Sequence, residues 1–269
     1  MILGISGRKQ SGKSTTANFI FSIYMSNMNI SEKVYINDSG EIMVSDLFGD
    51  TNYSGIFDTI NINTEDYTLN KVFDTLSPYI KIYNFADILK QDICMNLLGL
   101  TYKQCYGSDD DKNTMTSLNW ENMPGIISDS EFWNFITADN QPKKLIFHKS
   151  GIMTAREVME YIGTGIFRQI MSDVWINGTI KKIQKEKPKL AIIADCRFPN
   201  EIQSIKNNNG KILRLTRDPH NSNEPSERAL DMLNYNWNNF DYIVDNKDMN
   251  IFEQLSTIKD TLSSLFVSC

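Results

Sequence analysis

Residues 7–14 near the amino terminus have the types and spacing of a phosphate-binding loop. They read GRKQSGKS, which fits the pattern G-x-x-x-x-G-K-[ST], and they lie between an apolar run and a helical pattern. The glycines permit backbone angles that other residues avoid, so successive N–H groups can converge on an anion at the helix N-terminus. The sequence therefore predicts that this loop binds phosphate through its backbone.

Several side chains of this loop have distinct expected roles. Lys13 is expected to reach the β- and γ-phosphates of a nucleoside triphosphate, and the Ser14 hydroxyl is expected to ligate Mg²⁺. ATP is thus the expected phosphoryl donor and Mg²⁺ the expected cofactor. The other ATP-binding residues predicted in the loop and the first helical turn are Gly7, Lys9, Gln10, Ser11, Gly12 and Thr15.

A second chemical cluster follows an apolar run late in the chain. Leu190–Asp195 ends in a carboxylate, and Arg197 stands two residues later. Because the carboxyl ends of parallel strands meet at one sheet edge, we expect Asp195 to hold the metal and Arg197 to bind the acceptor phosphate. A structural pair between Arg197 and Glu201 is the alternative. Cys196 between them is expected to be a small buried residue.

Short apolar runs and longer amphipathic patterns alternate along the chain, which predicts an α/β fold with a buried parallel sheet. The expected strands are Ile2–Ser6, Tyr79–Tyr83, Leu190–Asp195, Lys211–Thr216 and Asp241–Val244. The expected helices are Ser14–Ser26, Ala86–Leu98, Thr154–Ile170, Trp175–Lys185, Asn200–Asn208 and Ile251–Phe266.

Two irregular stretches interrupt this alternation. Residues 27–78 are expected to be an insert, in which Val34–Ile36 and Glu41–Val44 form a β-hairpin around a turn at residues 37–40. Residues 107–150 contain the acidic run Asp109–Asp111, for which a solvated loop is a better explanation than a cation site.

Composition excludes several classes of protein. A net charge of −6 and a pI near 5.1 argue against a surface that grips a nucleic-acid polymer. Four cysteines without a C-x-x-C pair favour free thiols over a zinc site. The amino-terminal apolar run is too short for a signal peptide, and no apolar stretch is long enough to span a membrane. A soluble cytoplasmic protein is expected.

Taken together, the motifs resemble those of the bacteriophage-type deoxynucleoside monophosphate kinases, relatives of adenylate kinase among the P-loop kinases. The resemblance spans most of the chain. It rests on residues 7–14, Phe85–Lys90, Tyr106-Gly107, Thr154–Arg156, Gly163-Thr164, Arg168, Trp175-Ile176 and Asp195–Glu201. It implies a P-loop NTPase three-layer fold whose five parallel strands have the order 2-3-1-4-5. It also implies one domain over residues 1–269, with an acceptor-binding region at 85–176 and a lid at 217–238.

The resemblance implies ATP-dependent phosphorylation of a deoxynucleoside monophosphate to the diphosphate. The implied substrates of the protein are small molecules. A bacteriophage origin would place the protein in the host cytoplasm, and a homodimer is one option for its oligomeric state. Arg217 and Arg228 are the implied lid arginines, Arg217 also stabilising charge, and Asn246 is implied to contact the adenine of ATP. The implied acceptor-binding residues are Lys90, Arg156, Gly163, Thr164, Arg168 and Arg197.

The chain also departs from the family pattern. Residues 224–227 read EPSE, where the family usually has a histidine two residues before Ser-Glu, and Ile88 stands where proline is common. Structural alternatives stay open for several residues. Arg156 and Arg168 could form surface salt bridges, Asn246 could cap a helix, and Trp175 could be core rather than a base-stacking residue.

Three other functions are alternatives to a deoxynucleoside monophosphate kinase. A P-loop kinase for another phosphorylated acceptor, such as dephospho-coenzyme A, would share the sheet and the loop. A nucleotide-binding module could sense or sequester deoxynucleotides without turnover. An ATPase acting on nucleic acid is disfavoured by the acidic balance. The preferred base, the preference for ribose or deoxyribose and the role of residues 27–78 are left open by the sequence.

Overall fold

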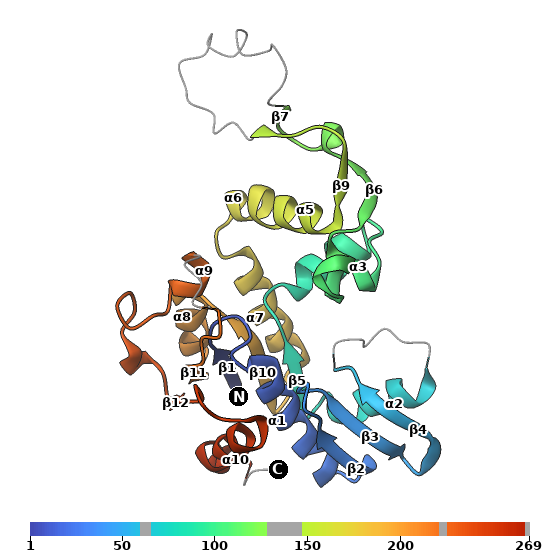
Figure 1. The fold of residues 1–269 in the computed structure, drawn as a ribbon, viewed down its shortest axis with the longest axis vertical. Helices are drawn as coiled ribbons and strands as arrows, with labels where there is room; N and C mark the ends of the chain where they lie inside the picture. Colours follow the sequence, from blue (N-terminus) through green and yellow to red (C-terminus); the bar gives the residue numbers. More distant parts are fainter. Residues whose placement is uncertain (60–65, 128–146, 221–224, 267–269) are drawn as a thin grey trace. The chain divides into compact units, whose positions relative to one another are not determined.

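A computed structural model describes residues 1–59, 66–127, 147–220 and 225–266. These residues form two compact units (Figure 1). Unit 1 comprises Met1–Phe85 and Ile176–Cys269, and unit 2 comprises Ala86–Trp175. In the described part of the chain, no helix combines the length and apolar character needed to cross a bilayer.

Unit 1 is built on a five-stranded sheet in which every neighbouring pair is parallel. Its strands are β1 (Ile2–Ser6), β5 (Ile80–Tyr83), β10 (Leu190–Cys196), β11 (Lys211–Leu215) and β12 (Tyr242–Val244), in the order β12-β11-β1-β10-β5. The predicted α/β class and parallel sheet are confirmed. The strand labels differ from the expected 2-3-1-4-5 because strands of smaller sheets intervene along the chain. Counted among themselves from the β5 edge, the five strands run 2-3-1-4-5.

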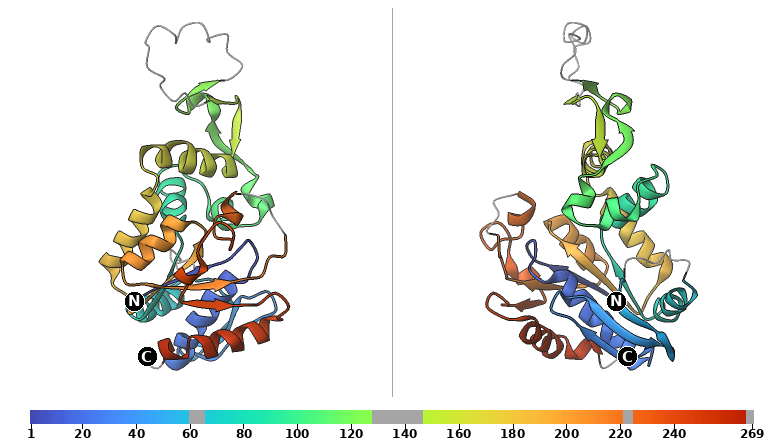
Figure 2. Two further views of the ribbon diagram at one scale, coloured as in Figure 1. Left: turned by 90° about the vertical axis from the view of Figure 1, so that its left-hand side faces the viewer. Right: turned by 45° about the vertical axis from the view of Figure 1, so that its right-hand side comes forward.

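Helices cover both faces of this sheet, so the central strands are buried on both sides (Figure 2). On one face, α1 (Lys13–Asn27) lies beside α10 (Ile251–Thr261), which is followed by α11 (Ser263–Phe266). On the other face lie α7 (Val174–Glu186) and α8 (Pro199–Asn207), and Gln184 of α7 donates to Asn208, the residue that follows α8. Gly4 of β1 permits close packing of α8, since a Cβ there would lie 2.7 Å from Ile205 Cδ1.

The insert forms a three-stranded antiparallel sheet followed by a helix. Its elements are β2 (Ser31–Ile36), β3 (Ile42–Leu47), β4 (Asp50–Phe57) and α2 (Tyr67–Leu76). The predicted hairpin is confirmed, with Val34 opposite Val44 across β2 and β3. The third strand and the helix were not predicted, and residues 60–65 lie outside the described residues. The tip of the hairpin rests on α1, where Asn18 Nδ2 donates to Gly40 O at 2.9 Å.

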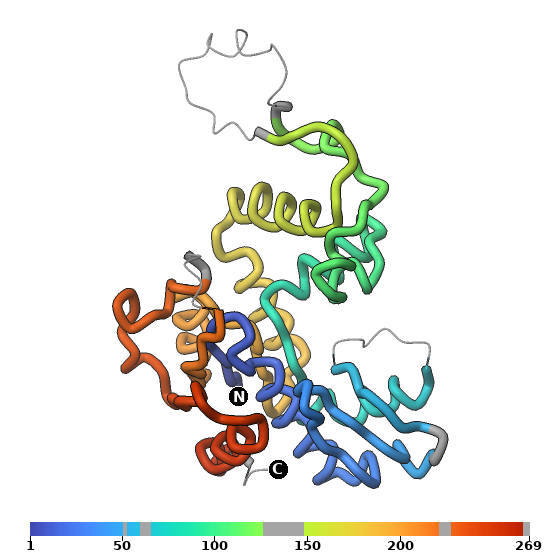
Figure 3. Tube along the Cα trace, viewed as in Figure 1, coloured from blue at the N-terminus to red at the C-terminus, as the bar shows by residue number. Residues whose placement is uncertain are grey.

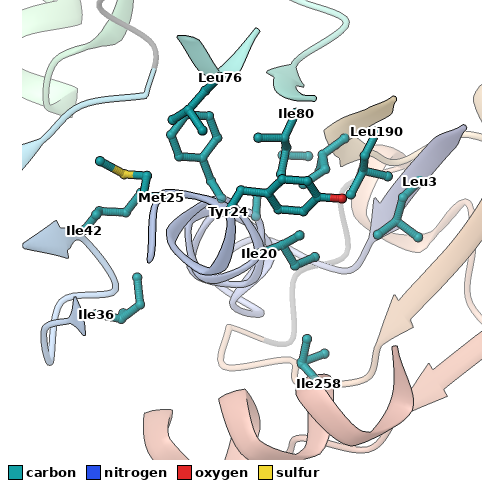
Figure 4. Packing of buried hydrophobic residues seen from close by; sticks show 14 of the residues in the cluster. Leu3, Ile20, Tyr24, Met25, Ile36, Ile42, Leu76, Ile80, Leu190 and Ile258 are labelled. Atoms are coloured by element: carbon teal, nitrogen blue, oxygen red, sulfur yellow. The ribbon is translucent and has the colours of Figure 1, made fainter. Parts of the chain in front are cut away.

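The insert shares one hydrophobic core with the main sheet. Figure 4 shows α1 between the two, with Met25 near Ile42 of the insert and Tyr24 near Leu190 of the sheet. Phe57 of β4 is 2% exposed, and its ring centroid lies 6.0 Å from that of Phe21 and 5.4 Å from that of Phe73. The insert is therefore part of the folding unit.

This shared core predicts a large stability effect inside the insert. Phe57→Ala should lower the free energy of unfolding by about 3–5 kcal/mol, because it leaves a cavity between α1 and α2. Ile56→Ala, one residue earlier on the same strand but 58% exposed, should change it by about 0.5 kcal/mol or less. Urea unfolding followed by circular dichroism measures both. Equal effects of the two substitutions would show that the insert does not share the core.

Unit 2 contains short helices and two small sheets. Figure 3 traces the Cα path of the chain in colours that follow the residue number. The helical elements of unit 2 are η1 (Ile88–Met95), α3 (Tyr102–Tyr106), α4 (Asp109–Lys112), η2 (Trp120–Asn122), α5 (Ala155–Glu160), η4 (Tyr161–Phe167) and α6 (Arg168–Ile170). Its strands are β6 (Met115–Asn119), β7 (Ile126–Ile127), β8 (Phe147–His148) and β9 (Ile152–Thr154). The predicted helix over residues 154–170 is present, and its glycine-rich interruption is the π-helical segment η4.

The chain between β11 and β12 contains the predicted lid, residues 217–238, which we call the lid segment. It includes α9 (Pro225–Arg228) and η5 (Trp237–Asn239). Residues 221–224 lie outside the described residues, as does much of the polar stretch on which the lid prediction rested. The described parts of the lid segment belong to unit 1.

Candidate active site

The loop after β1 has the backbone conformation that its motif predicts. Gly12, which precedes α1, has a φ of +95°, and Gln10 has a φ of +58°. Ser11 N donates to Arg8 O at 3.1 Å, which closes the turn. A Cβ at Gly7 would lie 2.3 Å from Ser11 Oγ, so a larger residue at this position would have to displace the Ser11 side chain. The loop is therefore tightly curled at the N-terminus of α1, where backbone N–H groups can bind an anion.

A buried asparagine after β12 is hydrogen-bonded to the backbone of the loop. Asn246 is 0% exposed, and its side-chain nitrogen donates to Ser11 O at 2.8 Å. Its side-chain oxygen accepts hydrogen bonds from the backbone N–H groups of Thr216 at 3.1 Å and Arg217 at 2.9 Å. Asn250 caps α10, so Asn246 does not play the capping role considered above. Asn246 links the loop to the end of β11.

Gln254 of α10 completes this support, and the sequence analysis missed it. Its Oε1 accepts from Asn246 Nδ2 at 2.8 Å, and its Nε2 donates to Thr16 Oγ1 at 3.1 Å. A Cβ at Gly12 would lie 2.5 Å from Gln254 Nε2, so Gly12 also makes room for this side chain. A polar residue within the apolar stripe of α10 was the available signal. These hydrogen bonds use both N–H groups of the Asn246 side-chain amide and both lone pairs of its oxygen. Contact between Asn246 and adenine stays a prediction.

Lys13 lies inside the loop rather than in solvent. Its side chain is 8% exposed, and its Nζ donates to Gly7 O at 2.7 Å and to Arg8 O at 2.6 Å. Burial, followed by the positive charge of Arg197, lowers the pKa of Lys13 to about 8, although nearby carboxylates oppose this shift. The ammonium group is thus poorly compensated and well suited to pairing with an anion.

The pKa of Lys13 predicts a pH dependence of nucleotide binding. Below about pH 8 the ammonium group is charged and can pair with phosphate, whereas above this value the free protein holds a neutral amine. The Kd for ATP, measured by calorimetry, should therefore rise by about tenfold per pH unit above pH 8. Lys13→Arg stays charged and should bind with a nearly constant Kd over the same range. A wild-type Kd as constant as that of the arginine variant would contradict this role.

The end of β10 brings a carboxylate and an arginine to the same sheet edge as the loop. β10 pairs directly with β1, in a register that places Ser6 opposite Cys196. Asp195 Oδ1 accepts a hydrogen bond from Phe85 N at 2.9 Å, which fixes this carboxylate at the strand end. Asp195 and Arg197 are both close enough to influence the pKa of Lys13. Burial raises the pKa of the Cys196 thiol well above its ordinary value, as expected of a structural cysteine.

The guanidinium group of Arg197 points to a carboxylate of the lid segment. Its Nη1 lies 2.6 Å from Glu227 Oε1, and the other Glu227 oxygen accepts from the backbone N–H of Lys9 in the loop. Glu201, the alternative partner, instead accepts from the backbone N–H groups of Arg197 and Phe198 at the start of α8. Arg197 and the loop therefore converge on one anionic group.

Three further contacts join the lid segment to the loop, and the sequence analysis did not anticipate them. Arg8 Nε and Nη2 donate to the two oxygens of Asp231 at 3.2 and 2.6 Å, and Nη1 pairs with Asp218. His220 Nε2 lies 2.6 Å from Gln10 Oε1. No local pattern signals these contacts, because more than 200 residues separate the partners.

The two predicted lid arginines have different surroundings. Arg217 Nε donates to Asn246 O at 3.0 Å, and its Nη2 donates to Met249 O, so this side chain is anchored beside the loop after β12. Arg228 is more exposed, and its Nε lies 3.9 Å from Asp231 Oδ2. Arg217 is therefore held by the residues that follow β12. The roles of both arginines in catalysis stay predictions.

In unit 2, Lys90 is held against an aromatic ring. Its Nζ lies 4.4 Å from the ring centroid of Tyr106, and the Tyr106 hydroxyl donates to Asp87 Oδ1 at 2.9 Å. Burial and the neighbouring Asp87 carboxylate raise the pKa of Tyr106 well above its ordinary value. The three residues from two family motifs thus form one polar cluster in the acceptor-binding region predicted from the sequence.

The arginines of unit 2 are placed at and near α5. Arg156 Nη2 pairs with Asp109 Oδ1 at 2.7 Å, and its Nε donates to Asn113 Oδ1 at 3.0 Å, so it forms the surface ion pair considered as an alternative. Arg168 is half-buried at the start of α6. The acidic run forms α4, and Asp111 takes part in its capping box. Acceptor binding by either arginine stays a prediction.

The glycine-rich segment of η4 permits close packing in unit 2. A Cβ at Gly163 would lie 2.6 Å from Leu89 Cδ2, so Gly163 allows η1 to approach η4. The carbonyl of Gly163 accepts from Trp175 Nε1 at 3.2 Å, and Trp175 is 5% exposed. This supports the core interpretation of Trp175. Thr164, beside this contact, is exposed.

The fold and the loop together define a P-loop nucleotide-binding protein. A model of the family described as deoxynucleotide monophosphate kinase matches residues 1–258, and the chain belongs to this family. The family implies kinase activity toward deoxynucleotide monophosphates. No curated protein matches the chain.

Proposed function

We propose that this protein transfers the γ-phosphoryl group of ATP to a deoxynucleoside monophosphate, forming the diphosphate and ADP. The observation that carries the proposal is the convergence of the loop and Arg197 in unit 1. The backbone N–H of Lys9 and the guanidinium group of Arg197 bind the same carboxylate, with the ammonium group of Lys13 close by. A phosphoryl group in transfer carries its negative charge on oxygens that such donors can bind.

In the proposed reaction, an oxygen of the acceptor phosphate attacks the γ-phosphorus as the bond to the ADP oxygen breaks. Lys13 and Arg197 stabilise the charge of the transferring group, and Arg217 is a further candidate. A general base is unnecessary, because the acceptor phosphate is already ionised near neutral pH. Arg197 also serves as the acceptor-phosphate ligand. The protein thus acts mainly by positioning and by electrostatic stabilisation.

We propose that Mg²⁺ enters with ATP and is held in unit 1, where Ser14 stands in the first turn of α1 and Asp195 near the end of β10. In such sites Mg²⁺ takes one or two protein oxygens and completes its coordination with phosphates and water. The Ser14 hydroxyl and the Asp195 carboxylate would hold it. Bound there, the ion would neutralise charge on the β- and γ-phosphates.

We further propose that unit 2 binds the acceptor nucleotide. Lys90 contributes a cation beside Tyr106, and Arg168 and Thr164 lie on the segment that contains the π-helix. To bind the acceptor, Arg156 would have to leave its ion pair with Asp109. This ion pair is exposed and therefore weak. Gly163 serves by permitting close packing. As part of the same proposal, we infer that residues 1–269 function as a single kinase domain.

A panel of acceptors tests this function. ADP release should be measured by a coupled assay with ATP, Mg²⁺ and each of dAMP, dCMP, dGMP and dTMP, then with modified deoxynucleotides, ribonucleotides and dephospho-coenzyme A. At least one deoxynucleoside monophosphate should give the highest kcat/KM. A preference for dephospho-coenzyme A would replace the proposed acceptor. Binding of ATP by calorimetry without ADP release for any acceptor would identify a non-catalytic nucleotide-binding protein.

A further inference from the structure

Glu227 of the lid segment binds the same groups that the proposed function assigns to phosphate. It is 4% exposed, so its carboxylate is withdrawn from water. One oxygen accepts from the backbone N–H of Lys9, and the other lies 2.6 Å from Arg197 Nη1. A buried carboxylate bound to a loop N–H group and a guanidinium group has the charge and the acceptor oxygens of a phosphate substituent.

The rest of the lid segment extends this charge complementarity. Arg8, Lys13, Arg197 and Arg214 are cations of unit 1 that lie in or near the loop. Among the described residues of the lid segment, the carboxylates of Asp218, Glu227 and Asp231 lie close to these cations. Arg8 is held by two of these, and Arg214 Nη2 lies 3.9 Å from Asp231 Oδ1. The lid segment therefore neutralises the loop in the way that a bound polyphosphate would.

We infer that Glu227 is an intramolecular competitor of the nucleotide phosphates, and that its carboxylate must leave the backbone N–H of Lys9 and the guanidinium group of Arg197 before the substrates can bind there. This inference rests on the proposed function of the loop. A phosphate cannot accept from the Lys9 N–H while Glu227 does, and it would have to share the guanidinium group of Arg197 with the carboxylate. The apparent affinity for an anion is then the intrinsic affinity reduced by the fraction of molecules in which Glu227 has left.

The competition gives the lid segment a defined part in the catalytic cycle. Entry of ATP and acceptor displaces Glu227, because two phosphates bind the cations more strongly than one carboxylate. After transfer, the returning carboxylate competes with the departing phosphates and so favours product release. Between turnovers the same contact pairs the buried carboxylate of Glu227 with the more exposed guanidinium group of Arg197, because an unpaired buried charge is costly.

The first test measures binding of inorganic tripolyphosphate by calorimetry at constant pH. Glu227→Gln keeps the shape of the side chain but removes its charge, so the Kd should fall by about tenfold or more relative to wild type. Glu32→Gln, an exposed position on β2, is the matched control and should leave the Kd unchanged. Lys13→Ala should weaken binding in every background, which establishes that the probe occupies the loop.

The outcomes separate the two claims. Binding by wild type that depends on Lys13, with an equal or higher Kd for Glu227→Gln, would overturn the competition and leave the proposed function intact. Absence of tripolyphosphate binding in wild type and Glu227→Gln, or binding unaffected by Lys13→Ala, would overturn both. A fall in Kd confined to Glu227→Gln supports the inference.

A second measurement needs no variant, in case Glu227→Gln does not fold. Hydrogen–deuterium exchange of wild type should be followed in peptides covering residues 225–236 and the loop at residues 7–14, with and without tripolyphosphate. Displacement of Glu227 predicts faster exchange in the lid segment and slower exchange in the loop when the anion binds. Slower exchange in both would mean that the segment tightens over the anion, and would contradict the competition.

Discussion

Replacement of Lys13 by alanine is expected to reduce phosphoryl transfer by about 10³-fold or more. A single preorganised donor to a developing negative charge contributes on the order of 10²–10³ in kcat, and a buried ammonium group contributes a full charge as well. Lys13 is 8% exposed, and burial lowers its pKa to about 8, so little solvent competes for its charge. The effect should appear in kcat and not only in KM, because negative charge moves toward the leaving oxygen of ADP during transfer and is stabilised there more than in the ground state.

Folding should survive the loss of Lys13. The substitution removes a charge whose burial is unfavourable and leaves two loop carbonyls without this donor, and these effects oppose each other. The circular dichroism spectrum and the melting temperature should therefore stay close to those of wild type. Lys33→Ala, on the exposed side of β2, serves as the matched control and should keep full activity. Turnover by Lys13→Ala at the wild-type rate would remove the loop from the mechanism.

Replacement of Arg197 by alanine is expected to reduce transfer by roughly 10²–10³-fold. Its Nη1 lies 2.6 Å from Oε1 of Glu227, a carboxylate that also accepts from the loop at Lys9 N. A planar group that can bind two phosphate oxygens at once is difficult to replace, so Arg197→Lys should recover only part of the activity. Steady-state kinetics with ATP and the acceptor varied in turn measures both variants.

The pattern of kinetic constants distinguishes the role of Arg197 from a structural one. A residue that binds the acceptor phosphate should raise the KM for the acceptor more than that for ATP, in addition to lowering kcat. A purely structural pair with Glu227 predicts a lower melting temperature with little change in either constant. Equal turnover of wild type and Arg197→Ala with every acceptor would exclude Arg197 from the reaction.

The phosphate-binding loop and the main sheet could be predicted because their sequence signals are local. Residues 7–14 carry the loop conformation in their own glycines, and the motif is followed directly by α1. The central strands are buried on both faces, which makes Ile2–Ser6 and Leu190–Asp195 nearly continuous apolar runs. The adjacency of Asp195 to the loop then follows from parallel pairing of β1 with β10.

Other features required tertiary structure. β4 was missed because it contains Gly55 with a φ of +146° and polar residues in place of a regular alternation. The contacts of Glu227 and Asp231 with the loop join residues more than 200 positions apart, and no periodicity encodes them. Asn246 was predicted as a site residue from the family resemblance, but one of the four hydrogen bonds of its side chain is made to Gln254 of α10, a contact that the sequence does not reveal.

The central claim is that the loop and Arg197 act on a phosphoryl group that passes from ATP to a deoxynucleoside monophosphate. Incubation with [γ-³²P]ATP, Mg²⁺ and each unlabelled deoxynucleoside monophosphate, followed by chromatographic separation, tests it most directly. We predict label in the deoxynucleoside diphosphate for at least one acceptor, with none above background when Lys13 is alanine. Label found only in ATP or in inorganic phosphate, with every acceptor present in turn, would contradict the account.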